Sequence, residues 1–302
     1  MKAPNYLTYQ KQFTPYKWFK PLLVALVSAG FYLLLSIMLT IAGMVLANNQ
    51  GYDLQKMMTG GYDSLDAYSP VGAILSLGSV ALILPALAIG NRIINARPFS
   101  SYSSSRGGFS VSVFFKCLIA ALVLVGLPLV LLTVFLQKGS GQVKFTMLGF
   151  ILCTILLPLQ CAAEEYMCRG HLMQMFGSWI KIPVIPIILQ AIVFAAMHPY
   201  NITGIVSVGA MGIVLGICAH LTHGLEASVA LHVINNMVAF YLAGFGYGDV
   251  KTNVEIIDLV TTIGFSLLFL AFIVFADKKL GWFDHVKRDD VAAFNARIAA
   301  RQ

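Results

Sequence analysis

The stretch FTMLGFILCTILLPLQCAAEEYMCRG, residues 145–170, joins a long apolar run to two adjacent carboxylates, Glu164 and Glu165. Its apolar part approaches the roughly 20 residues with which a helix crosses a hydrocarbon layer. Such runs are expected to be helical because the backbone finds no water there and must satisfy its own hydrogen bonds. This stretch therefore predicts a membrane helix that carries acidic groups near one end.

The composition of the whole chain agrees with a membrane protein. Of the 302 residues, 58% are hydrophobic and 11% are charged, and the mean hydropathy is +0.80. Soluble domains carry roughly a quarter charged residues. The predicted fold class is all-α, a polytopic membrane protein with about eight transmembrane helices. The expected spans are 21–47, 70–91, 113–136, 146–163 with a helical extension to 176, 181–198, 203–221, 225–244 and 255–276.

The net charge is +7, and the basic residues that cause it fall mostly on one side of the predicted membrane spans. With the N-terminus in the cytoplasm, most Lys and Arg residues fall on the cytoplasmic side, as the positive-inside rule requires. The opposite side receives Lys56, Lys138, Lys144 and Lys251. We therefore expect a multi-pass protein of the cell membrane with both termini cytoplasmic, and no nucleic-acid partner.

Two acidic residues stand out because they lie in apolar surroundings. Between Asp66 and Glu226, the sequence contains no acidic residue other than Glu164 and Glu165. A charge at membrane depth costs several kcal/mol, so such residues indicate a functional site. Glu165 and Arg169 are four residues apart and can pair along one helix face. Glu164 is rotated about 100° from that face and is expected to line a cavity.

Further polar residues lie on two other predicted helices. His198, in IVFAAMHPYN (192–201), stands before a proline that helps to end its helix. His232 and Asn236, in LHVINNMV (231–238), are four residues apart and point the same way. Three helices can thus converge on one polar pocket. A carboxylate beside an imidazole suits the activation of water, and a second histidine with an amide can donate hydrogen bonds to an oxyanion.

Three motifs on successive predicted helices look like those of the CAAX protease and bacteriocin-processing (CPBP, or Abi) family of intramembrane endopeptidases. The motifs are Glu164-Glu165-x-x-x-Arg169, Phe194-x-x-x-His198 and His232-x-x-x-Asn236. The resemblance covers roughly residues 145–240 directly, and Gly170 follows the first motif as is common in the family. Each motif alone is a weak signal, but all three in order within apolar segments are a specific one.

The resemblance implies a proteolytic site that opens toward the cytoplasm. In it, Glu164 and His198 would activate the attacking water, and His232 and Asn236 would hold the oxyanion. Eukaryotic relatives remove the last three residues from prenylated C-a-a-X proteins, and many bacterial relatives are linked to bacteriocin maturation or self-immunity. The expected partners are therefore the lipid bilayer and a membrane-associated or lipidated peptide or protein substrate.

Three further residues are expected to support the site without reacting. Arg169 would orient it by pairing with Glu165, and Phe194 would hold the position of His198. The need for a metal stays open, because the sequence lacks an H-E-x-x-H motif. The candidate ligands Glu164, His198 and His232 could bind Zn²⁺ or another divalent metal, or could work without a cofactor.

On this prediction the chain has three parts. Residues 1–20 form a cytoplasmic interfacial segment, residues 21–276 form the eight-helix membrane domain with its catalytic core at 145–240, and residues 277–302 form a cytoplasmic tail. The loop 91–112, rich in Ser, Gly and Arg, is expected to be flexible. His171 is expected to be solvated.

The predicted spans place two of the candidate site residues at different depths in the membrane. Glu164 lies near the cytoplasmic end of its apolar run, while His198 lies near the far end of the next one. Straight helices would separate them by roughly 20 Å at a rise of 1.5 Å per residue. We expect the first of these helices to continue to about Phe176, and the turn 199–203 to lie inside the protein, where irregular backbone can line a cavity.

Two other classes of function remain open. One is a catalytically silent immunity or scaffold protein of the same fold. The other is a proton-coupled transporter, which also uses buried Glu and His residues. Transporters often contain matching repeats, but here the polar residues gather in the fourth, fifth and seventh predicted spans. This distribution favours the enzyme.

Overall fold

The computed structural model describes residues 3–55, 57, 66–136, 139–247 and 254–300. Within these ranges every regular element is a helix, apart from an isolated bridge between Ser104 and Gly224. The predicted all-α fold of a polytopic membrane protein is confirmed. Three of the lysines assigned above to the outer side, Lys56, Lys138 and Lys251, lie outside the described residues.

Among the described residues, seven helical stretches are long and apolar enough to cross a membrane. Four of them are single helices: α1 (Lys20–Asn49), α12 (Ile202–Leu221), α13 (Glu226–Gly244) and α14 (Ile256–Leu280). The other three are composite. Pro70–Ile94 contains α3 (Pro70–Ala73), η3 (Ile74–Gly78), α4 (Ser79–Ala81) and α5 (Ile83–Ile94); Val111–Leu136 contains α7 (Val111–Ala121), η4 (Leu122–Gly126) and α8 (Leu127–Leu136); and Met147–Trp179 contains α9 (Met147–Glu165), η5 (Tyr166–Leu172) and α10 (Met173–Trp179). Their bounds lie within a few residues of the predicted spans.

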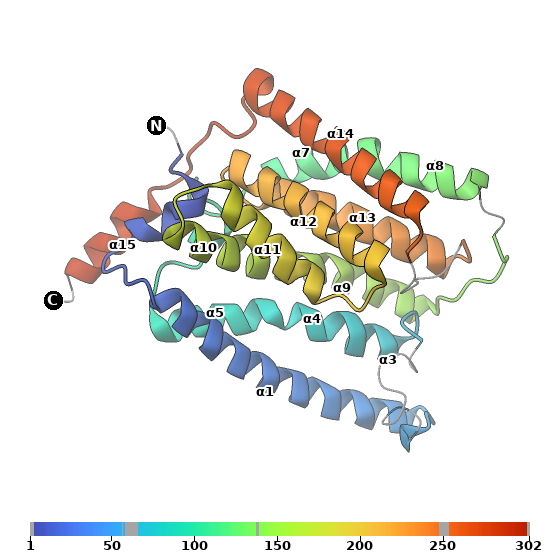
Figure 1. Cartoon of the computed structure of the whole chain (residues 1–302). Helices are drawn as coiled ribbons and strands as arrows, with labels where there is room; N and C mark the ends of the chain where they lie inside the picture. Colours follow the sequence, from blue (N-terminus) through green and yellow to red (C-terminus); the bar gives the residue numbers. More distant parts are fainter. Residues whose placement is uncertain (1–2, 56, 58–65, 137–138, 248–253, 301–302) are drawn as a thin grey trace.

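The remaining predicted span, 181–198, corresponds to the shorter apolar helix α11 (Val184–Ala196), which has 13 residues. At 1.5 Å per residue such a helix extends about 20 Å, whereas the hydrocarbon layer is about 30 Å thick. The chain then turns at 197–201 and enters α12. In Figure 1 this turn stops short of the ends of α8 and α13.

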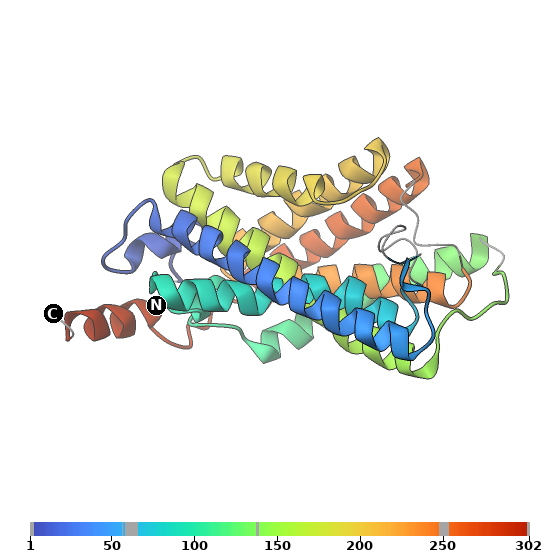
Figure 2. The ribbon, with the colours of Figure 1, turned by 90° about the horizontal axis from the view of Figure 1, so that it is seen from below.

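The helices form a bundle in which α13 and α12 are the most enclosed (Figure 1). α13 packs against α7, α9 and α12, and α12 packs also against α11 and α14. α1 runs along α5 at one edge, and in Figure 2 it crosses in front of the other helices. Its outer apolar side chains, such as Leu26 and Leu33, are exposed, as expected for a surface that faces lipid.

The first and last described elements of the chain contact each other. The short helix η1 (Tyr6–Gln12) leads to Phe13, whose ring packs edge-on against Phe294 of α15 (Asp290–Ala299) with 5.5 Å between ring centres. The backbone N–H of Thr14 donates to Asn295 Oδ1 at 2.8 Å. Helices η1 and α15 therefore lie at the same end of the bundle, as Figures 1 and 2 show.

Segment η1 also packs closely against α10. Gln10 Nε2 donates to Ser178 Oγ at 2.8 Å. A Cβ atom added at Gly177 would lie 2.5 Å from the carbonyl oxygen of Leu7. This glycine therefore allows the backbone of the N-terminal segment to approach the helix that carries Glu164 and Glu165.

We expect Gly177→Ala to lower the free energy of unfolding by about 1–3 kcal/mol, because one methyl group must displace backbone that cannot move freely. The measurement is thermal unfolding of the full chain in detergent. Gly30→Ala is the matched control, since a Cβ at Gly30 meets nothing within 4 Å. Equal melting temperatures for the two variants would show that η1 does not dock on α10 in this way.

The loop 91–112 is not the flexible segment that its composition predicts. It contains the short helix α6 (Ser100–Ser103), and Ser101, Ser104 and Arg106 are buried. Arg106 Nη2 pairs with Glu226 Oε2 at 2.7 Å. The expectation was wrong because Ser and Gly residues favour loops without indicating whether the loop packs against the protein.

Candidate active site

Glu164 and Glu165 lie near the middle of the helical run Met147–Trp179, which has 33 residues. The predicted continuation of this helix to about Phe176 is confirmed, because α10 ends at Trp179. The π-helical segment η5 begins directly after Glu165. Such turns widen a helix locally and are frequent at functional sites. The two carboxylates therefore lie at a depth where their partners must come from this helical run or from the helices packed against it.

Glu165 is fully buried and has two polar partners on one oxygen. Its Oε1 accepts a hydrogen bond from Arg169 Nη1 at 2.6 Å and lies 2.8 Å from His232 Nδ1. Arg169 is also fully buried. A buried charge is costly unless it is paired and hydrogen-bonded, and this carboxylate has both kinds of contact. The pair expected from the spacing is present, and a histidine of α13 joins it.

His232 connects the two carboxylates. Because the Glu165 carboxylate is an acceptor, His232 Nδ1 carries the proton in this contact. His232 Nε2 lies 3.2 Å from Asn236 Nδ2 and 3.5 Å from Glu164 Oε2. In the neutral imidazole, Nε2 accepts from the Asn236 amide. In the imidazolium, Nε2 carries a proton toward Glu164.

Glu164 is 5% exposed and is held through one of its two oxygens. Its Oε1 accepts a hydrogen bond from Gln160 Nε2 at 2.9 Å. Among the described residues, Oε2 has no hydrogen-bond donor, and it faces His232 Nε2 at 3.5 Å. The lone pairs of Oε2 are therefore directed into the site and can accept a proton.

Phe194 lies between three of the polar residues. The guanidinium carbon of Arg169 is 4.3 Å from the centre of its ring, a cation–π distance. The ring meets His198 edge-on at 4.8 Å and His232 edge-on at 5.8 Å between ring centres. Phe194 is 2% exposed, so α11 contributes an apolar wall that holds all three side chains.

His198 lies in the turn that follows the end of α11 at Ala196 and is half-buried. Its Nδ1 lies 2.8 Å from the Phe194 carbonyl oxygen, so Nδ1 carries the proton and Nε2 is left as an acceptor. Burial, and after it the charge of Glu164, raises the pKa of the neighbouring Tyr200 phenol. Hydrogen bonds join Arg169, Glu165, His232 and Asn236 into one network. Glu164 approaches this network through its 3.5 Å contact with His232 Nε2, and His198 approaches it through the Phe194 ring.

The candidate metal ligands do not form a metal-binding cluster in this conformation. Among the described residues, no group of three or more His, Cys, Asp or Glu side chains is arranged to hold a metal ion. His232 Nδ1 is engaged by Glu165, and His198 Nδ1 by a backbone oxygen. These contacts leave the Nε2 atom of each histidine available as a ligand, and the steps proposed below use the side chains of the chain itself.

Sequence reasoning missed two glutamines that belong to this region. Gln160 holds Glu164, as described above. Gln190 of α11 is fully buried and donates to the Gly212 carbonyl oxygen at 2.9 Å, to which Arg169 Nη2 also donates at 3.3 Å. The signal was available, because Gln160 lies four residues before Glu164 and Gln190 four residues before Phe194. Uncharged amides do not stand out by charge in an apolar run.

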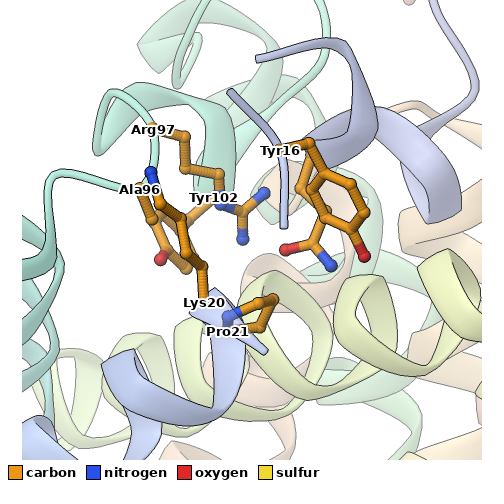
Figure 3. Close-up of a pocket in the computed structure, with 7 residues that line it drawn as sticks. Tyr16, Lys20, Pro21, Ala96, Arg97 and Tyr102 are labelled. Atoms are coloured by element: carbon orange, nitrogen blue, oxygen red, sulfur yellow. The ribbon is translucent and has the colours of Figure 1, made fainter. Parts of the chain in front are cut away.

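A second polar group lies nearby but is separate from the Glu164 site. Arg97 is 3% exposed, and its Nη2 donates to the Gly170 carbonyl oxygen at 3.0 Å. Figure 3 shows its guanidinium beside the Tyr102 ring in a pocket that also contains Lys20. The cavity volume is about 10 Å³, room for roughly one water-sized group. The pocket contains none of the predicted site residues.

His171 lies on the same side of the helix as Arg97 and is not solvated, contrary to the expectation. It is 3% exposed, and its ring stacks at 5.9 Å between ring centres on Tyr102. The expectation was wrong because the segment 91–112 covers this part of the helix. His171 is therefore part of the packing behind the site.

The fold and the site together define a polytopic membrane protein with a partly buried Glu/His/Asn centre. A sequence model of the family described as type II CAAX prenyl endopeptidase Rce1-like matches residues 143–238. This range contains all seven predicted site residues. The resemblance drawn from the three motifs is confirmed, and the matched family is one of CAAX proteases. No curated protein and no solved structure matches the chain.

Proposed function

We propose that this chain is an intramembrane endopeptidase that hydrolyses a peptide bond near the membrane-embedded or lipidated end of its substrate. The observation that carries the proposal is the buried contact of Glu164 Oε2 with His232 Nε2 at 3.5 Å, with His232 fixed from behind by Glu165. The match to CAAX prenyl endopeptidases over residues 143–238 supports the reaction class.

In the first step, water attacks the carbonyl carbon of the scissile bond. Glu164 Oε2, which has no donor among the described residues, takes one proton of the water. His198 Nε2, left as an acceptor by the Nδ1 contact with Phe194, holds the other hydrogen of the water. The water thereby becomes more nucleophilic, and no free hydroxide forms because its proton is removed as it attacks.

The tetrahedral intermediate carries its negative charge on the former carbonyl oxygen. His232 takes part as the imidazolium and keeps both of its protons throughout. Asn236 Nδ2 and His232 Nε2 donate to the former carbonyl oxygen, and the Glu165 carboxylate stabilises the imidazolium through Nδ1. When the C–N bond breaks, Glu164 returns its proton to the leaving amine. Arg169 and Phe194 remain outside the reaction and hold Glu165, His198 and His232 in place.

The proposed substrates are lipidated or membrane-anchored peptides, because the site lies between helices of membrane length. The proposal includes a site that opens toward the cytoplasm and termini on that side. The bias of basic residues supports this orientation, and the contact between η1 and α15 supports placing both of these elements on one side. The proposal also keeps the predicted division of the chain into segment 1–20, membrane domain 21–276 and tail 277–302.

The test is cleavage of defined peptides by the purified full chain. A farnesylated peptide that ends in Cys-aliphatic-aliphatic-X should lose its last three residues, detected by mass spectrometry, while its unprenylated counterpart should be cleaved much more slowly. In inside-out vesicles of the cell membrane, peptide added outside should be cleaved; in right-side-out vesicles it should not. Lack of cleavage of every lipidated or membrane-anchored peptide tested would contradict the proposed function.

A further inference from the structure

Gln160 carries an amide oxygen whose hydrogen-bonding capacity is unused. Among the described residues, Gln160 Oε1 has no hydrogen-bond partner and is out of contact with solvent. The orientation of the amide is fixed by chemistry. Its NH₂ group must face the Glu164 carboxylate, 2.9 Å away, because a carboxylate accepts and cannot donate. Turning the amide over would place two acceptor oxygens against each other, so Oε1 points away from Glu164.

An acceptor without a donor in a buried place has an energetic cost, and a ligand that supplies the donor recovers it. Peptide substrates supply such donors, since each residue other than proline has a backbone N–H that needs a partner in a water-poor site. In a helical substrate those groups are already bonded within the helix. A free N–H is therefore a mark of extended substrate backbone.

We propose that Gln160 is a substrate-binding residue whose Oε1 accepts a backbone N–H of an extended peptide beside the scissile bond. This inference rests on the proposed function and adds to it a requirement on substrate conformation. One end of the Gln160 amide holds the base Glu164, and the other end binds the chain to be cut. The side chain thus fixes the peptide relative to Glu164 Oε2, which receives the proton of the water.

The inference predicts a specificity. A proline or an N-methylated residue at the position whose N–H binds Gln160 leaves Oε1 without a donor. Sites that are built around a substrate N–H discriminate strongly against analogues that lack it. Elsewhere in the peptide, N-methylation should matter less.

The experiment is an N-methyl scan of a dye-labelled farnesylated peptide, with binding to the full chain in detergent measured by fluorescence anisotropy. In the wild type, methylation at one position should weaken binding about tenfold, the loss of one hydrogen bond. Gln160→Met has a side chain of similar volume without the amide. It should bind the unmethylated peptide about tenfold more weakly than the wild type does. Methylation at that position should then have no further effect.

Leu159→Met is the matched control, since Leu159 is the neighbouring residue and is exposed. Its scan should equal that of the wild type. Gln160→Asn retains the amide but retracts it, and it should also lose the position-specific effect. If Gln160→Met does not fold, Gln160→Asn tests whether Gln160 binds the backbone N–H of the peptide. Methylation effects that are equal and additive in wild type and Gln160 variants would overturn the inference, as would the absence of peptide binding.

Cleavage of the same peptides separates this inference from the proposed function. Binding that shows the expected coupling without any cleavage would support the role of Gln160 and contradict the endopeptidase. Cleavage with purely additive methylation effects would support the endopeptidase and contradict the role of Gln160.

Discussion

Glu164→Gln should reduce peptide turnover by about 10²–10⁴-fold, the range over which a general base contributes to catalysis. The glutamine amide has nearly the shape of the carboxylate but cannot take a proton from water at neutral pH. Since Glu164 Oε2 has no hydrogen-bond donor among the described residues, its charge is not needed to hold the fold. We therefore expect the variant to insert and to fold with nearly the melting temperature of the wild type.

The turnover number is measured with the prenylated peptide at saturating concentration, beside thermal unfolding in the same detergent. Asp284→Asn is the matched control because Asp284 is exposed after the end of α14 and its substitution makes the same change from carboxylate to amide. It should leave turnover unchanged. Cleavage by Glu164→Gln at more than a tenth of the wild-type rate would contradict the assignment of Glu164 as the base.

Arg169→Ala should lower the free energy of unfolding by about 3–5 kcal/mol, the cost of leaving a buried charge without its partner. The substitution removes the 2.6 Å contact with Glu165 Oε1, the donor to Gly212, and the cation over the Phe194 ring. Activity should fall with stability, because Glu165 then loses the contact that fixes it against His232.

Thermal unfolding of the full chain in detergent measures this effect. Arg92→Ala is the control, since Arg92 is exposed near the end of α5, and surface substitutions change stability by about 0.5 kcal/mol or less. The double variant Arg169→Ala with Glu165→Gln should be more stable than Arg169→Ala alone, because the unpaired charge is then removed. A double variant that is no more stable would show that Glu165 does not depend on Arg169 for compensation.

Hydropathy was sufficient to predict the seven membrane-length helices among the described residues, since a membrane span needs a length of apolar residues that can be read directly from the sequence. The bounds of the run from Met147 depended on one further argument. Glu164 and His198 had to approach each other, so the helix had to continue past the apolar residues. The spacing of Glu165 and Arg169 was likewise enough to predict their pair, because both residues lie on one helix.

Contacts between helices could not be obtained in this way. The approach of His232 Nδ1 to Glu165 depends on how α13 rotates against α9, which no local spacing determines. The packing of segment 91–112 over His171 is likewise a tertiary contact that no local spacing determines. The resemblance gave the site residues as a set, and the structure adds that His232 touches both carboxylates while His198 reaches the network through Phe194.

The contact of η1 with α15 has a consequence for biosynthesis. The ribosome makes residues 6–13 before the membrane helices and residues 290–299 after them, so Tyr9 and Phe13 meet Phe294 only when the helices between them have been made. Until then this aromatic surface is uncovered. A nascent chain released before α15 would display it to chaperones and proteases, so the contact with Phe294 distinguishes chains in which α15 has been made.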